Sequence, residues 1–204
     1  MRCVLATSNE HKREEIAAIV ESMGVHGITF VSLRDYPDIP PAVEDGATFA
    51  ENARIKALHV SSVTGGWALA DDSGLVVDAL DGRPGIHSAR YAGDHATDAD
   101  RVAKLLGELS GVPTATRTAR FACHMALTHG GRVHVEAEGV CEGVIADAPS
   151  GEHGFGYDPI MWLPDLECTV AELSADGKNR ISHRAQAIRG LKQSLMDIVA
   201  PPRA

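Results

Sequence analysis

Short apolar runs and helix-spaced apolar positions alternate along the first half of the chain. The runs CVLA, GITFVSL, WALA and LVVDAL, which begin at residues 3, 27, 67 and 75, have the length of buried strands. Apolar residues recur every three or four positions over 16–23 and again over 49–60. This second spacing is typical of amphipathic helices, so the pattern predicts strands that alternate with helices.

Capping and turn residues mark where these elements begin and end. The residues TSN at 7–9 are good N-caps for the first helix, which should stop at Gly24. Thr48 begins the second helix, with Glu51 at capping-box spacing. The proline-rich stretch DYPDIPPAVEDG at 35–46 cannot continue a strand and predicts a loop.

The second half of the chain adds a hairpin and further helices. A helix is predicted from Asp98 to Leu109. The stretches 118–131 and 132–146 alternate or nearly alternate, with Gly130 and Gly131 between them, which predicts an antiparallel hairpin. After the polar segment SADGKNRISH, a final helix carries apolar residues on one face from Ala185 to Ile198.

The Gly-rich stretch 81–97 predicts a long loop, and the stretch 151–164 predicts a Gly-rich loop that runs into a short apolar strand. The tail PPRA is expected to fray. Strands that alternate with helices, together with one long hairpin, predict a single α/β domain over 1–204 with a mixed sheet. Ligands of open α/β sheets bind at the carboxyl ends of strands. The polar turns after CVLA and WALA are predicted to lie at such ends.

Composition narrows the possible functions. The net charge of -9 argues against a broad nucleic-acid surface, whereas a small anionic ligand needs only a local cluster of cations or a metal. No apolar run is long enough to span a membrane, and MRCVLATSNEHK does not resemble a signal peptide. The expected location is therefore the cytoplasm. Four cysteines without CxxC spacing predict buried free thiols.

The stretch TSNEHK at 7–12 joins a strand to a helix N-terminus. Free backbone N–H groups and the helix dipole favour an anion there, and Lys12 lies one turn along. An ordinary helix cap with a solvated lysine is the alternative.

Asp71 and Asp72 are adjacent between two apolar runs. The residues of DDSG favour turns, so a turn at the end of a strand would explain the pair. The alternative is an oxygen-ligand site for Mg2+, with Glu44 or Glu51 as a second carboxylate.

Two later stretches also carry candidate chemistry. GFGYDP at 154–159 could be a turn with core aromatics, or a place where backbone and an aromatic ring approach a flat ligand. KNRISHR at 178–184 gathers cations at the start of a helix, where the dipole prefers anions. A negative or strongly accepting group is therefore expected nearby, although a solvated charge run is the alternative.

The motifs LATSNEHK, ENARIKA, ADDSGLVVDALDGRPGIHSARYAG, GFGYDPI and SHRAQAI stand in this order along almost the whole chain. In this combination the sequence closely resembles the inosine triphosphate pyrophosphatase family, the non-canonical purine NTP pyrophosphatases that include Ham1 and RdgB proteins. The resemblance implies an elongated, two-lobed α/β fold of the ITPase-like (Maf/Ham1) type. Its mixed central sheet would be flanked by helices, with the active site in the cleft between the lobes.

The resemblance also implies a function. It implies a cytoplasmic homodimer that hydrolyses ITP, dITP and XTP to the monophosphate and pyrophosphate with Mg2+, cleansing the nucleotide pool and keeping these nucleotides out of DNA and RNA. No nucleic-acid or membrane partner is expected.

The family's site residues carry over onto matching positions. Asp72 matches the family's catalytic residue, which is also a metal ligand. Glu44 matches a second carboxylate of the metal site, although AVEDG departs from the usual motif of an acidic residue followed by Thr and Gly. The implied substrate contacts are Thr7, Ser8, Asn9, Glu10, His11, Lys12, Ser73, Phe155, Gly156, Tyr157, Asp158, Lys178, His183 and Arg184. Ser8 stands where a glycine is frequent.

These assignments lead to a mechanistic hypothesis. Water would attack the α-phosphorus, and Lys12 would stabilise the pyrophosphate leaving group. The primary role of Asp72 would be that of a metal ligand, and its secondary role that of a proton acceptor. Donors from Lys178, His183 or Arg184 would satisfy the 6-carbonyl of hypoxanthine and repel the amino group of adenine. Phe155 would stack on the base. The alternatives are a pyrophosphatase for other nucleotides, a nucleotide-sensing module without turnover, and a nucleic-acid binding protein.

Overall fold

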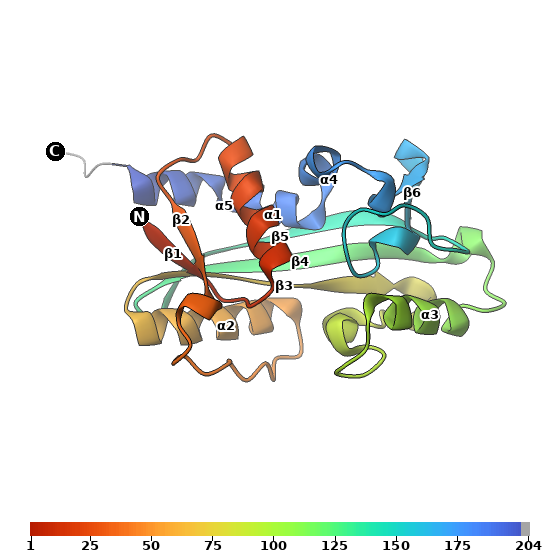
Figure 1. Cartoon of the computed structure of the whole chain (residues 1–204), viewed down its shortest axis with the longest axis horizontal. Coiled ribbons are helices and arrows are strands. Elements are labelled where there is room, and N and C mark those ends of the chain that lie inside the picture. The colour runs from red at the N-terminus through yellow and green to blue at the C-terminus, as the bar shows by residue number, and fades with distance from the viewer. Residues whose placement is uncertain (201–204) are drawn as a thin grey trace. The chain divides into compact units, whose positions relative to one another are not determined.

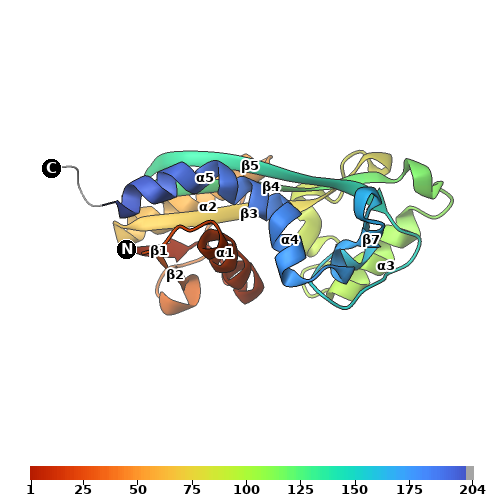
Figure 2. The same cartoon turned by 90° about the horizontal axis from the view of Figure 1, so that it is seen from above.

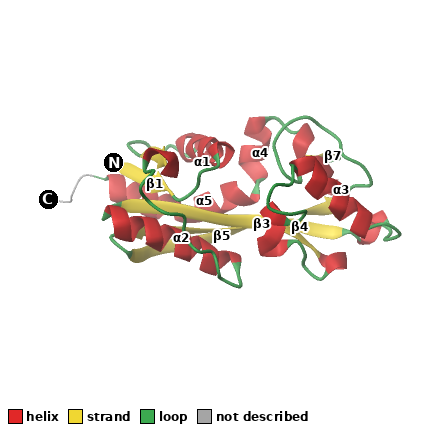
Figure 3. Cartoon of the chain, turned by 60° about the horizontal axis from the view of Figure 1, so that its bottom comes forward, coloured by secondary structure: helices red, strands yellow, loops and turns green. Residues whose placement is uncertain are grey.

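The protein has an α/β fold built on one mixed sheet. The computed structural model describes residues 1–200, so the tail PPRA lies outside the described residues. Within residues 1–200, seven strands lie in the order β2-β1-β3-β4-β5-β6-β7. Helices lie around the strands, which are yellow in Figure 3. Their bounds are β1 Arg2–Leu5, β2 Thr29–Ser32, β3 Trp67–Val77, β4 Thr118–His129, β5 Arg132–Ile145, β6 Met161–Leu163 and β7 Cys168–Thr169. β1 pairs in parallel with β2 and β3, whereas β6 pairs antiparallel with β5 and β7.

The described part of the chain contains five α-helices, which are labelled in Figure 1. They are α1 Glu10–Ser22, α2 Phe49–Thr64, α3 Asp98–Glu108, α4 Ala175–Ile181 and α5 His183–Val199. The chain forms two compact units: unit 1 contains residues 1–72, 123–139 and 183 onward, and unit 2 contains residues 73–122 and 140–182. The residues of β3, β4 and β5 are divided between the two units.

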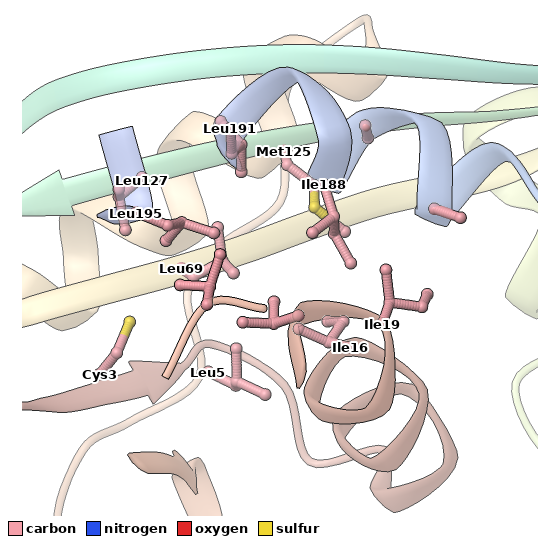
Figure 4. Packing of buried hydrophobic residues seen from close by; sticks show 14 of the residues in the cluster. Cys3, Leu5, Ile16, Ile19, Leu69, Met125, Leu127, Ile188, Leu191 and Leu195 are labelled. Atoms are coloured by element: carbon pink, nitrogen blue, oxygen red, sulfur yellow. The ribbon is translucent and has the colours of Figure 1, made fainter. Parts of the chain in front are cut away.

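Unit 1 has helices on both faces of its part of the sheet. α1 and α5 cover one face and α2 covers the other (Figures 1 and 2). Large side chains fill the layer under α1 and α5, including Leu5, Ile16, Leu69, Met125 and Leu191 (Figure 4). The layer under α2 is mostly alanine and valine. Small side chains let this helix lie close to the sheet, because no bulky group separates the two backbones.

Unit 2 has a separate apolar core. Leu75 and Val77 of β3 pack with Leu105 of α3 and with Ile145 of β5. Tyr157, from the Gly-rich loop, belongs to the same core and is 5% exposed. This loop is therefore fixed to the core of unit 2 through an aromatic side chain.

Several predictions from the pattern are confirmed. Thr48 caps α2, and its hydroxyl accepts from the N–H of Glu51 at 3.1 Å. Asn9 caps α1 in the same way, since its side chain accepts from the N–H of Lys12. β4 and β5 form the predicted hairpin, with Gly130 and Gly131 both at positive φ in the turn.

Among the described residues, no helix has the length and apolar content that crossing a membrane requires.

Other predictions are wrong. The DDSG segment is not a turn, because β3 continues without a break from Trp67 to Val77. The polar segment 174–183 was expected to lead into the last helix, but it forms the separate short helix α4, capped by Ser174 (Figure 2). The stretch 81–97 is less irregular than expected, since Gly85–Arg90 forms a 3-10 helix. Local capping bonds account for α4, whereas the apolar pattern contains little information about it.

Candidate functional site

The turn between β1 and α1 follows the geometry of a helix N-terminus. The hydroxyl of Thr7 accepts from the N–H of Asn9 at 3.1 Å, and Asn9 Oδ1 accepts from the N–H of Lys12 at 3.3 Å. Ser8 and His11 are exposed on the same turn. Glu10 bonds to the Arg13 guanidinium at 2.6 Å. The turn thus presents a helix N-terminus with one aligned cation, Lys12, and such a terminus favours an anion.

Asp71 lies at the centre of a buried cluster of charges in unit 1. Its Oδ2 is 2.9 Å from Lys12 Nζ and 3.3 Å from Arg184 Nη2. Arg184 Nη1 in turn pairs with Glu15 of α1. Burial alone would raise the pKa of Asp71, but the charges of Lys12, Arg184 and Lys56 outweigh it and hold that pKa far below its usual value. Asp71 is therefore a permanent anion that holds two cations in place.

Asp72 lies in a second charge cluster, with Lys56 and Glu44. Lys56 Nζ is 2.7 Å from Asp72 Oδ1 and 3.0 Å from Glu44 Oε2. Burial raises the pKa of Asp72, and the partial compensation by Lys56 does not reverse this shift. The pKa of Lys56 is also raised: burial lowers it, but Asp72 and Asp71 outweigh that effect. Asp72 is thus a more basic carboxylate than an ordinary aspartate.

Strand geometry separates the two aspartates. Successive side chains of a strand point to opposite faces of the sheet. Asp71 follows the register of Leu69, on the face covered by α1 and α5, whereas Asp72 follows Ala68 and Ala70, on the face covered by α2. Each carboxylate therefore meets cations from a different helix, and neither needs a turn.

Asp72 and Glu44 are suitable residues for a divalent cation. Two carboxylates converge on one positively charged atom, Lys56 Nζ, which shows that this position accommodates a cation. Within residues 1–200 there is no group of three or more potential metal-ligating acids, histidines or cysteines. Mg2+ commonly takes only one or two carboxylates and completes its shell with water and substrate phosphates. The pair therefore fits Mg2+.

The Gly-rich loop of unit 2 is held by several hydrogen bonds. Asp158 Oδ2 accepts from the N–H of Phe155 at 2.9 Å and from Lys178 Nζ at 2.8 Å. The same ammonium lies 4.6 Å from the centre of the Phe155 ring, a cation–π contact. The N–H of Gly156 donates to Asp98 at 2.6 Å, and the hydroxyl of Tyr157 donates to the carbonyl of Ser88 at 3.0 Å. The structure thus brings the predicted residues Phe155, Gly156, Asp158 and Lys178 together.

His183 and Arg184 begin α5 and are buried, at 6% and 1% exposure. A close approach to β5 positions this end of the helix, because a Cβ at Gly139 would lie 2.1 Å from the carbonyl oxygen of His183. Arg184 was expected to contact the nucleotide. Its guanidinium forms ion pairs with Asp71 and Glu15, so it also holds Asp71 in place, and its contact with the nucleotide stays a prediction.

Comparison with known proteins identifies the family. The sequence model of the Ham1 family matches residues 3–194. The chain belongs to the Ham1 family. Its relatives include a protein named dITP/XTP pyrophosphatase from Geobacillus kaustophilus, 52% identical over 96% of this chain and 95% of that protein. A protein of the same name from Geobacter sulfurreducens is 50% identical over 95% of this chain and 96% of that protein.

Solved structures of Ham1 proteins are similar to this chain. A HAM1 protein from Coxiella burnetii has a TM-score of 0.86 at 42% identity, and covers 97% of this chain and 99% of its own. The Ham1 protein of Staphylococcus aureus has a TM-score of 0.85 at 35% identity, and covers 97% of this chain and 100% of its own. These matches confirm the family resemblance and the α/β fold that the motifs implied.

The sequence did not point to Lys56 and Glu15 as members of these charge clusters, nor to the role of Asp71. Lys56 was counted only as part of the helical pattern of α2, together with Ala53, Ala57 and Val60. A lysine among apolar residues on the buried face of a helix was the available signal. Glu15 and the role of Asp71 had no comparable signal, because their partner Arg184 is 169 and 113 residues away.

Proposed function

We propose that this Ham1-family protein is an Mg2+-dependent pyrophosphatase that converts ITP, dITP and XTP to the monophosphate and pyrophosphate. Removing these nucleotides would keep them out of DNA and RNA. The observation that carries the proposal is the convergence of Asp72 and Glu44 on one cation, Lys56 Nζ. The names of the relatives, dITP/XTP pyrophosphatase, support the substrate class.

The triphosphate is assigned to unit 1. The α1 N-terminus and Lys12 provide N–H groups and positive charge for phosphate oxygens. Asp72 and Glu44 would hold Mg2+, which when bound would neutralise phosphate charge and stabilise the leaving group. Lys56 already bonds to both carboxylates, so it orients them in the absence of the metal.

The reaction breaks the bond between the α-phosphorus and the oxygen that bridges to the β-phosphorus. A water molecule attacks the α-phosphorus and loses a proton, and pyrophosphate leaves with the bridging oxygen. Asp72 would act primarily as a metal ligand, and its oxygen that does not bind the metal would orient this water and accept its proton. Lys12 stabilises the charge that develops on the pyrophosphate.

The base is assigned to the Gly-rich loop of unit 2. Lys178 lies over the Phe155 ring, so an aromatic face and an ammonium donor are adjacent. A purine with a 6-carbonyl accepts from such a donor, whereas the amino group of adenine would meet it donor to donor. Ser73, His183 and Arg184 stay proposed substrate contacts. The homodimer and the cytoplasmic location also stay proposals.

The test measures products. Purified protein is incubated with ITP, dITP, XTP, ATP, GTP and dCTP, with and without Mg2+, and monophosphate, diphosphate, pyrophosphate and phosphate are resolved. We expect Mg2+-dependent monophosphate and pyrophosphate from the first three only. Asp72→Asn should lose most turnover but still bind ITP, whereas Asp165→Asn, at an exposed surface carboxylate, should behave as wild type.

The other outcomes discriminate between the alternatives. Diphosphate with phosphate would place the attack at the γ-phosphorus and contradict the mechanism. ITP binding without turnover would favour a nucleotide-sensing module. Turnover of dCTP in preference to ITP would favour a pyrophosphatase for other nucleotides. Full activity of Asp72→Asn would refute the role of Asp72.

A further inference from the structure

The segment that carries Glu44 is attached to the first turn of α2 by two backbone N–H groups. Gly46 donates to Asn52 Oδ1 at 2.9 Å, and Ala47 donates to Glu51 Oε2 at 2.7 Å. Asn52 is 3% exposed, whereas Glu51 lies at the surface. A buried amide oxygen that bonds to a loop N–H fixes that loop, because losing the bond would leave a polar group without water.

Gly46 fits closely against the same residues. A Cβ at this position would lie 2.7 Å from Asn52 Oδ1 and 2.7 Å from the Cβ of Glu51. Gly46 is not among the glycines with positive φ, so space rather than backbone conformation requires a glycine there. The contact between the loop and α2 is therefore close as well as hydrogen-bonded.

The spacing along α2 connects this contact to the metal-binding carboxylates. Asn52 and Lys56 are four residues apart, so they lie on one face of the helix, one turn from each other. Asn52 holds Gly46, and Lys56 holds Glu44 two residues earlier in the loop. Two consecutive turns of α2 thus bind two nearby points of the loop.

We propose that Asn52 is a positioning residue for Glu44. Its amide oxygen fixes Gly46 on α2, and this contact places the Glu44 carboxylate where it can share a cation with Asp72. The loop contact itself follows from the hydrogen bond and the close approach. Its consequence for Mg2+ rests on the proposed function.

The test compares Asn52→Ala with Ser61→Ala. Ser61 is a matched control because it is a buried polar residue of α2, 0% exposed, and its hydroxyl also accepts from a loop N–H, that of Gly131 at 3.2 Å. Two quantities are measured: the Mg2+ concentration for half-maximal pyrophosphate release, and the amide hydrogen exchange of residues 43–47 without metal or substrate.

We expect Asn52→Ala to raise the required Mg2+ concentration about tenfold, at the lower end of the effect of residues that orient metal ligands. It should also accelerate exchange over 43–47. Ser61→Ala should leave the Mg2+ requirement within about twofold of wild type, and exchange over 43–47 unchanged, even if it lowers the thermal midpoint as much.

A second variant tests the contact from the loop. Gly46→Ala should reproduce the effect of Asn52→Ala, because its methyl group would displace the loop from α2. Since both changes break one contact, the double variant should show less than the product of the two single effects. Multiplicative effects would contradict the shared contact.

The outcomes separate this inference from the proposed function. If the wild type shows no Mg2+-dependent pyrophosphate release, the proposed function fails. In that case the amide hydrogen exchange of residues 43–47 still tests whether Asn52 fixes the loop on α2. If release is normal but Asn52→Ala changes neither the Mg2+ requirement nor the exchange, or if Ser61→Ala changes the Mg2+ requirement equally, the inference is overturned.

Discussion

Replacing Asp71 with asparagine should destabilise the protein strongly, although the two side chains have nearly the same shape. Asp71 is the buried anion between Lys12 and Arg184. Removing its charge leaves the Arg184 guanidinium, which is 1% exposed, with less negative charge around it. An uncompensated buried charge is costly because it has lost its hydration.

The magnitude follows from the partners that remain. Breaking a buried ion pair by removing one member costs about 3–5 kcal/mol. Arg184 retains Glu15, and the Lys12 side chain is 18% exposed and can turn toward water. We therefore expect Asp71→Asn to lower the free energy of unfolding by about 3 kcal/mol, at the lower end of that range.

The loss should depend on pH in a defined direction. The folded-state pKa of Asp71 lies far below the unfolded value of about 3.9, so the carboxylate contributes stability above pH ~4. That contribution decreases as the pH falls toward the folded-state pKa. The difference between wild type and Asp71→Asn should therefore be full at pH 7 and smaller below pH ~4.

Urea unfolding at pH 7 and pH 3, followed by circular dichroism, measures both effects. The adjacent variant Asp72→Asn is the control, because Asp72 is a neighbouring carboxylate whose cation, Lys56, keeps Glu44 as a partner. Asp72→Asn should cost less stability than Asp71→Asn, since the side chains of Lys56 and Asp72 are 12% and 13% exposed and burial already disfavours the charge of Asp72. A loss below about 1 kcal/mol for Asp71→Asn, or equal losses for both variants, would refute this assignment of the two aspartates.

Two further predictions concern unit 2 and the thiols. Tyr157→Phe removes the hydrogen bond to the carbonyl of Ser88 and should lower the free energy of unfolding by about 1 kcal/mol. Because it loosens the proposed base loop, it should raise the KM for ITP more than it lowers kcat. An unchanged KM would contradict the link between this hydrogen bond and base binding. Burial raises the pKa of the Cys3 and Cys123 thiols to about 12, so a thiol reagent at pH 8 should label the partly exposed Cys168 first and these two only on unfolding, as mass spectrometry of the labelled peptides would show.

Much of the fold could be predicted because its signals are local. Thr48 and Asn9 cap the helices that follow them, and the double glycine at 130–131 joins two alternating strands, as their sequences indicated. The motif order identified the family. In each case the information lies within a few neighbouring residues, where chain geometry decides the structure.

The charge clusters could not be predicted in the same way. Asp71 and Asp72 have turn-forming chemistry, and only the packing of α1, α2 and α5 on the sheet supplies enough cations to keep them inside a strand. The ion pair between Arg184 and Glu15 could not be predicted either, because the two residues are far apart in the sequence. Pairing across more than one hundred residues is a property of the tertiary structure.

The alternation of side chains along β3 gives two identical neighbouring residues, Asp71 and Asp72, different partners on opposite faces of the sheet. A deletion or insertion of a single residue just before Asp71 would shift the aspartates by one position relative to the sheet. The carboxylate that now holds Arg184 would then face Lys56, and its neighbour would face the opposite layer. A change in length here would therefore leave one of the two charge clusters without its carboxylate, because another residue would take the position of one aspartate.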